Sequence, residues 1–267
     1  MPARRVAIVT GAARGIGAAT VLALAGQGWS VLAVDLASDD PALPYPMASE
    51  AELSGTLDRA RHAAGADDVA GYRADVRDQA AIATAVAEAE ARWGGLDAAI
   101  AAAGVIAGGV PLWEVPLEQE QAVLDVDLGG VISLARAALP ALLRRPEPRS
   151  GRFLAVASSA ATRGIPMLAA YCAAKAGVAG LVRALGAELG GTGVTANAVS
   201  PGSVATPMLD ESARLYGLPD ARSFAAQQPE RRLLEPAEVA AVIAFLAGPD
   251  SSAMTGAVVP VDGGLAL

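Results

Sequence analysis

Tyr171 and Lys175 form the pair of side chains in this sequence that is best suited to acid–base chemistry. They stand four positions apart in a proline-free run, Ala169 to Leu189, whose alanine, leucine and valine residues predict a helix. On a helix, positions i and i+4 share a face, so the lysine ammonium can lie beside the phenol. A nearby cation lowers the tyrosine pKa from about 10 toward working pH, which would make the pair a general acid and base. The alternative is an amphipathic helix with both residues at its rim.

Two adjacent serines, Ser158 and Ser159, follow the apolar run Gly151–Ala157. If that run is a strand, their hydroxyls lie at the carboxyl edge of a sheet, where α/β folds bind ligands. Serine at the end of a strand is usually a turn residue. The serines therefore indicate a site only together with Tyr171 and Lys175.

A glycine-rich turn follows the first apolar run, Val6–Thr10, and opens a helix-length segment. Glycine lets the backbone turn tightly and approach a pyrophosphate, while a helix N-terminus offers free N–H groups to the phosphates. Three glycines alone could equally serve strand–helix packing. The candidate nucleotide-binding residues of this turn are Gly11, Arg14, Gly15, Ile16 and Gly17.

Asp35 ends the second apolar run, 18 residues after Gly17. A carboxylate there can accept hydrogen bonds from the adenosine ribose and would repel a 2′-phosphate, which favours NAD over NADP. Arg14 favours NADP instead, because a cation in the glycine turn could bind a 2′-phosphate. We give the carboxylate more weight, since it is the charge nearer the ribose. Further contacts to the adenosine half are expected from Leu36, Asp75 and Val76.

Short apolar runs rich in β-forming residues alternate with helix-length segments along the chain. Strands that are apolar at nearly every position are buried on both faces, which predicts a parallel sheet between two layers of helices. We expect an α/β fold: one doubly wound, Rossmann-like domain over residues 1–267, in three α/β/α layers. The expected strands are Val6–Thr10, Ser30–Asp35, Val69–Ala74, Asp97–Ala102, Gly151–Ala157, Thr195–Ser200 and Val258–Val261. The expected helices are Gly15–Gly26, Gln79–Trp93, Leu117–Leu143, Ala169–Glu188 and Pro236–Ala247.

Two segments interrupt this alternation. Residues 37–53 make the connection from Asp35 to Asp75 longer than one helix with two short loops requires, and a capping pattern near residue 50 predicts a helix start. This insertion lies beside Asp35 and carries apolar Tyr45 and Met47, so we expect a lid over the adenosine half of the cofactor; a neutral surface loop is the alternative. Residues 206–234 carry several large apolar side chains, which fits either a lid over an apolar substrate or a subunit interface. They are Met208, Leu209, Leu215, Tyr216, Leu218 and Phe224.

Composition excludes several classes of function. The 267-residue chain has a formal charge of -8, 53% hydrophobic and 18% charged residues, which argues against disorder and against a nucleic-acid binder. With one histidine, His62, and one cysteine, Cys172, we expect no metal site, disulfide framework or histidine-based triad. The uncharged stretch from Gly15 to Val34 contains four glycines and fits a helix, turn and strand better than a membrane span. No signal-peptide pattern precedes the first strand, so we expect a cytoplasmic protein.

Together, the motifs of this chain resemble those of the short-chain dehydrogenase/reductase family over almost the whole length. In family order they are Thr10-Gly11-x-x-x-Gly15-Ile16-Gly17, Asp75-Val76, the serine pair, Tyr171-x-x-x-Lys175 and Pro201-Gly202-x-x-x-Thr206. The resemblance implies an NAD-dependent oxidoreductase that interconverts an apolar secondary alcohol with its carbonyl compound. It also implies that Tyr171 transfers the proton, that Lys175 lowers the tyrosine pKa and binds the nicotinamide ribose, and that a serine orients the reacting oxygen.

The family spacing leaves the choice of serine open. Counting back 13 residues from Tyr171 gives Ser158, whereas anchoring on the preceding strand gives Ser159. We prefer Ser159, because strand registers shift less readily than loops. The resemblance also implies cofactor contacts from a later turn, at Pro201, Gly202, Val204 and Thr206.

Two positions depart from the family pattern. Ala101-Ala102-Ala103-Gly104 stands where the family has Asn-Asn-Ala-Gly, so side-chain amide bonds are missing, while backbone contacts to the cofactor from Ala102, Ala103 and Gly104 could remain. Asp127 stands where the family has an asparagine that holds a water linked to the lysine. A carboxylate would hold Lys175 protonated, and we expect Asp127 to be a fourth member of the catalytic set.

The segment Tyr45-Pro46-Met47-Ala48 resembles the mycofactocin-associated, carveol-dehydrogenase-like branch of the family. That resemblance implies an NAD that is held tightly and re-oxidised in place by a redox partner, mycofactocin. We further expect a homo-oligomer, either a dimer or a tetramer. Two rival functions stay open: a freely exchanging reductase with NADP preference, and a dinucleotide-binding sensor or scaffold without turnover.

Overall fold

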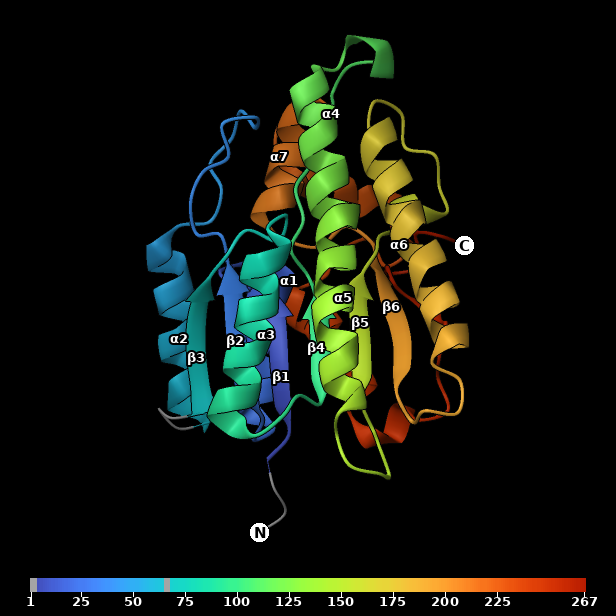
Figure 1. The fold of residues 1–267 in the computed structure, drawn as a ribbon. Coiled ribbons are helices and arrows are strands. Elements are labelled where there is room, and N and C mark those ends of the chain that lie inside the picture. Colours follow the sequence, from blue (N-terminus) through green and yellow to red (C-terminus); the bar gives the residue numbers. More distant parts are fainter. Residues whose placement is uncertain (1–3, 65–67) are drawn as a thin grey trace.

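A central sheet of seven parallel strands organises the molecule (Figure 1). The computed structural model describes residues 4–64 and 68–267, so residues 1–3 and 65–67 of the expected domain lie outside the described part. The strand order is β3-β2-β1-β4-β5-β6-β7. The strands are β1 (Val6–Thr10), β2 (Ser30–Asp35), β3 (Val69–Arg73), β4 (Ala98–Ala101), β5 (Arg152–Val156), β6 (Thr195–Pro201) and β7 (Val258–Val261). All seven expected strands are confirmed, each to within one residue at either end.

Helices cover both faces of the sheet, as the apolar strands predict. Two buried hydrophobic clusters lie between the sheet and its helices, one on each face. Helices α1, α2 and α8 pack on one face, and α3, α5 and α6 pack on the other. The helices are α1 (Gly15–Gly26), α2 (Glu50–Ala64), α3 (Gln79–Trp93), α4 (Leu117–Leu124), α5 (Gly130–Leu143), α6 (Ala169–Glu188), α7 (Pro207–Leu215) and α8 (Pro236–Ala247). The molecule is therefore the single doubly wound α/β domain that the sequence predicts.

The expected helix Leu117–Leu143 contains an irregular turn. Between α4 and α5 lies a π-helical turn, η3 (Asp125–Gly129), and such turns are frequent at functional positions. This continuous rod is the one helix of the described residues long and apolar enough to cross a membrane by length and composition, and half of its most apolar window is buried in the fold. The uncharged stretch from Gly15 to Val34 is α1, a turn and β2, as expected.

The two segments that interrupt the alternation of strands and helices, residues 37–53 and 206–234, have different structures. Residues 37–49 form a loop of turns, and α2 begins at Glu50, where the capping pattern predicts it; Ser49 and Glu52 make the reciprocal bonds of a capping box. The second excursion is more ordered than the sequence indicates, since it contains α7 and a short helix, η5 (Ala221–Gln227). A β-bridge between Val204 and Leu234 closes its base.

Candidate active site

A cavity of about 590 Å³ opens at the carboxyl edge of the sheet. Strand order reverses its direction between β1 and β4, and α/β sheets bind ligands outside the strand ends at such a point. Except for Asp127, every sequence-predicted catalytic and cofactor-binding residue lines this cavity. The fold thus brings together residues from position 11 to position 206 of the chain.

The glycine turn fits a dinucleotide. Gly11 has a φ of +67°, and a Cβ there would lie 2.6 Å from the Ala103 backbone. A Cβ on Gly17 would lie 2.0 Å from the Gly11 carbonyl oxygen. The turn therefore closes only with glycine at these two positions. No side chain caps the N-terminus of α1 at Arg14, which leaves its first N–H groups able to bind phosphate oxygens.

Asp35 is held in place by the glycine turn itself. Its two carboxylate oxygens accept hydrogen bonds from the backbone N–H groups of Ala13, at 2.9 Å, and Ala37, at 3.0 Å. The carboxylate therefore stands at the end of β2 beside the turn that would hold the pyrophosphate. Arg14, the cation that argued for a 2′-phosphate, donates instead to the Pro46 carbonyl at 3.1 Å.

Asp75 and Arg77 form a charged group at the end of β3. The Arg77 guanidinium binds Asp75 at 2.6 Å and Asp40 at 2.8 Å. Burial opposes the charge on Asp75, but the hydrogen bonds from Arg77 outweigh it and hold the pKa of that carboxyl below its ordinary value. Both residues line the cavity, where an adenine is expected.

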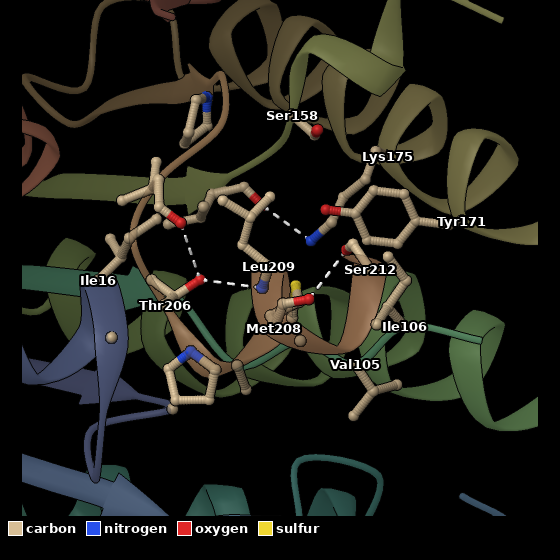
Figure 2. A pocket seen from close by; sticks show the side chains of 18 of the residues that line it. Ile16, Val105, Ile106, Ser158, Tyr171, Lys175, Thr206, Met208, Leu209 and Ser212 are labelled. Atoms are coloured by element: carbon tan, nitrogen blue, oxygen red, sulfur yellow. Dashed lines mark hydrogen bonds between the residues drawn. The ribbon is translucent and has the colours of Figure 1, made fainter. Parts of the chain in front are cut away.

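Tyr171 and Lys175 meet on α6 as their spacing predicts. The Lys175 ammonium lies 5.5 Å from the centre of the Tyr171 ring and donates to the Val156 carbonyl at 3.1 Å (Figure 2). Lys175 lowers the Tyr171 pKa, but burial is the larger effect and the net pKa lies above the ordinary value. Lys175 thus acts in the predicted direction, but burial and the charge of Asp127 keep the pKa of Tyr171 above its ordinary value.

Of the two serines, Ser158 is the one that pairs with the tyrosine. A side-chain hydrogen bond with Ser158 lowers the Tyr171 pKa. Ser158 also caps the short helix η4 (Ser159–Ala161) by accepting from the Ala160 N–H at 3.1 Å. Ser159 is buried at the start of that helix. Both serines line the cavity, and the effect on the phenol leads us to propose Ser158, the residue that the count gives, in place of Ser159.

Asp127 lies behind the cavity wall and contacts the catalytic lysine. Asp127 Oδ2 is 3.0 Å from Lys175 Nζ, and Asp127 Oδ1 accepts from the Val105 N–H at 2.7 Å. Burial lowers the pKa of Lys175, but Asp127 and Tyr171 together outweigh it and raise that pKa above its ordinary value. Burial also raises the pKa of Asp127, against the opposing effects of Lys175 and the Val105 N–H. That Asp127 holds Lys175 protonated stays a prediction.

The missing family asparagines are replaced by other side chains. The Thr10 hydroxyl accepts from the N–H groups of Ala102 and Ala103, at 3.3 and 3.4 Å. Together with the bond from Val105 to Asp127, these contacts hold the backbone after β4. The alanine sequence therefore keeps this loop against the glycine turn without side-chain amides.

The insertion crosses the cavity as a strap, defined here as residues 37–49. It is fastened at three points: Arg14 to the Pro46 carbonyl, Asp40 to Arg77, and the Ile106 N–H to the Tyr45 hydroxyl at 3.0 Å. The sequence indicated a lid here but not the Asp40 and Ile106 contacts. For the Asp40 contact, the acidic pair Asp39-Asp40 was the available sequence signal. The Ile106 contact has no sequence signal, because its donor is a backbone N–H.

The other end of the cavity is apolar. Its lining residues include Ile165, Pro166, Met208, Leu209, Tyr216 and Phe224. Thr206 caps α7 by accepting from the Leu209 N–H, and its methyl group lies near Gly15. Residues 206–234 therefore form a cover over the Tyr171 end of the cavity.

Comparison with known proteins defines the class. A family profile described as enoyl-(acyl carrier protein) reductase matches residues 11–266. Cis-4-hydroxycyclohexanecarboxylate dehydrogenase of Sinomonas cyclohexanicum is 38% identical over 98% of this chain and 96% of its own length. The chain belongs to the short-chain dehydrogenase/reductase family.

Solved structures agree with this assignment. Carveol dehydrogenase from Mycobacterium avium, in complex with NAD, has a TM-score of 0.91 and 30% identity, covering 99% of this chain and 98% of its own. An actinorhodin polyketide ketoreductase variant with NADPH has a TM-score of 0.87 and 33% identity, covering 98% and 97%. This protein is therefore an NAD(P)-dependent oxidoreductase that acts on alcohol or carbonyl groups.

Proposed function

We propose that the protein uses NAD to interconvert an apolar secondary alcohol and its ketone, with Tyr171 as general acid and base. The observation that carries the proposal is the group of Tyr171, Lys175 and Ser158 at the apolar end of the cavity. The likeness to relatives named for ring alcohols supports a cyclic substrate.

The residues divide the work according to their positions. Ser158 and Tyr171 can both hydrogen-bond the reacting oxygen, and Tyr171 gives its proton to a forming alcohol or takes one from a reacting alcohol. Lys175 stabilises the phenolate that remains. Bound NAD would supply the carbon that exchanges hydride with the substrate. The apolar cover at residues 206–234 excludes water from that exchange.

NAD is the proposed dinucleotide because Asp35 stands at the ribose position. The Ala13 and Ala37 N–H groups fix its carboxylate there, and a 2′-phosphate would meet that negative charge. Arg14 is tied to the strap and so is not free to compensate. A relative that carries NADPH keeps the freely exchanging, NADP-using enzyme as the rival function.

The strap supports the further proposal that NAD stays bound between turnovers. Its three fastenings join the glycine turn, the end of β3 and the loop after β4, which surround the adenosine and pyrophosphate half of the cavity. A resident NAD must be re-oxidised in place, and mycofactocin is the redox partner that we propose. We also propose a homo-oligomer, since Leu112, Trp113 and Leu117 leave apolar surface exposed. The proposed compartment is the cytoplasm.

The catalytic assignment is tested by Tyr171→Phe, which removes only the phenol oxygen. We expect turnover of cyclic alcohols, measured with NAD and an artificial electron acceptor, to fall about 100- to 10,000-fold, the usual contribution of a general acid or base. Tyr72→Phe is the matched control, because Tyr72 lies on β3 away from the cavity lining. Unchanged turnover in Tyr171→Phe would contradict the mechanism, and a wild-type protein that binds NAD without any turnover would favour the sensor.

A further inference from the structure

Asp127 is a buried charge whose position depends on an irregular helix. It is 0% exposed and lies in the π-helical turn η3, which turns it toward α6. Its two oxygens have different partners: Oδ1 accepts from the Val105 N–H, and Oδ2 faces the Lys175 ammonium at 3.0 Å. Among the described residues, none donates a hydrogen bond to Oδ2, and its contact with the Lys175 ammonium is an ion pair. The carboxylate is therefore committed to the lysine.

The charges around this pair come from several elements. On α6, Lys175 and Cys172 both act on Tyr171. β5 contributes the Val156 carbonyl, and Ser158 contributes its hydroxyl. The strap brings Tyr45 within reach of Asp127 and of Glu211 on α7. Lys175 and Asp127 are the two ionisable groups with the largest charge effect on Tyr171, and their effects oppose each other.

We propose that Asp127 is a positioning residue that neutralises Lys175 and thereby raises the pH at which Tyr171 accepts a proton from the alcohol. The proposal rests on the proposed function of Tyr171. In this protein, Tyr171 then lies next to an ion pair between Asp127 and Lys175. An asparagine at position 127 would leave the positive charge of Lys175 unopposed.

The direction follows from electrostatics. In alcohol oxidation, the phenolate of Tyr171 takes the hydroxyl proton, so the rate rises with pH through the tyrosine pKa. A negative charge near the phenol disfavours the phenolate. At a separation of several Å in a partly polar interior, loss of that charge moves the midpoint by roughly one to two pH units. Removing the charge on Asp127 should therefore move the oxidation profile to lower pH.

Asp127→Asn isolates the charge, because the amide oxygen can still accept from the Val105 N–H. We expect the midpoint of kcat/KM for alcohol oxidation to fall by about one to two pH units. Asp125→Asn is the matched control: Asp125 lies two positions away in the same turn and accepts from the Gln121 side chain. This substitution should leave the midpoint unchanged. An Asp127→Asn protein that folds but keeps the wild-type midpoint, or shifts it to higher pH, would overturn the proposal.

A second measurement does not depend on turnover. Tyrosinate absorbance, titrated with and without Tyr171→Phe in each background, gives the ionisation of Tyr171 directly. We expect the Tyr171 component to titrate at lower pH in Asp127→Asn than in the wild type. If the shift occurs but no alcohol is oxidised, the inference about Asp127 stands and the proposed function fails. If oxidation proceeds and neither profile moves, the inference fails alone.

Discussion

In the proposed mechanism, Tyr171 accepts and releases a proton while buried inside the protein. Burial and Asp127 hold its pKa above the ordinary value, and Lys175 and Ser158 act in the opposite direction. The buried pair of Asp127 and Lys175 also links two parts of the site, because Asp127 holds the Val105 backbone as well. At the scale of single residues, the site is thus a balance of opposing charges, and one carboxylate can shift it.

Close packing in the glycine turn leaves no room for a side chain at Gly17. A methyl group there would lie 2.0 Å from the Gly11 carbonyl oxygen, a backbone atom that cannot move aside without opening the turn. We expect Gly17→Ala to lose tenfold or more in NAD affinity by calorimetry, while circular dichroism still shows a folded protein. Gly26→Ala, at the other end of α1, has no atom within 4 Å of the new methyl and serves as control. Equal NAD affinity in the two variants would contradict this reading of the turn.

Individual residues differ in how far the sequence could specify them. Tyr171, Lys175 and the glycine turn follow from local spacing, since four residues make one helical turn wherever the helix lies. The choice between Ser158 and Ser159 depends on how the loop leaves β5, which spacing does not encode. The Tyr171 pKa depends on burial and on Asp127, 44 positions earlier in the chain. Such distant contacts are set by tertiary packing.

Helices, strands and loops also differ in how far the sequence could predict them. All seven strands were predictable, because strands buried on both faces carry continuous apolar runs. The helix α7 was not, since it is short and lies in a segment that gave only a general apolar signal. The strap was predictable as an insertion but not as a fastened one. Its bonds join residues far apart in sequence, and two of the three involve backbone groups that carry no sequence signal.

The strap leads to a prediction about cofactor retention. Tyr45→Phe removes the hydroxyl that accepts from the Ile106 N–H, one of three fastenings, and we expect NAD to dissociate about two- to tenfold faster. The measurement is the NAD that remains after gel filtration without added nucleotide, released by denaturation. Tyr72→Phe, the same substitution outside the cavity, should retain as much as the wild type. A wild-type protein that emerges empty and exchanges external NAD rapidly would contradict the proposed resident cofactor.

At the scale of the whole molecule, the cavity has two covers at two ends. The strap leaves from β2 and lies over the half with Asp35, whereas residues 206–234 leave from β6 and lie over the half with Tyr171. The strap is a loop anchored at both ends by β2 and α2 and fastened along its length. The two covers belong to different parts of the chain, and we propose that one can open while the other stays closed.

Separate covers have a consequence for steady-state kinetics. If the alcohol can enter and leave while the dinucleotide stays, the alcohol and an external electron acceptor react in turn with the same enzyme molecule, and each product departs before the other reactant arrives. We expect parallel lines when reciprocal rate is plotted against reciprocal alcohol concentration at several concentrations of an artificial acceptor, a ping-pong pattern. Intersecting lines, with NAD itself behaving as a second substrate, would contradict this expectation. A short-chain dehydrogenase with this architecture would then follow the kinetic scheme of an enzyme with a built-in prosthetic group.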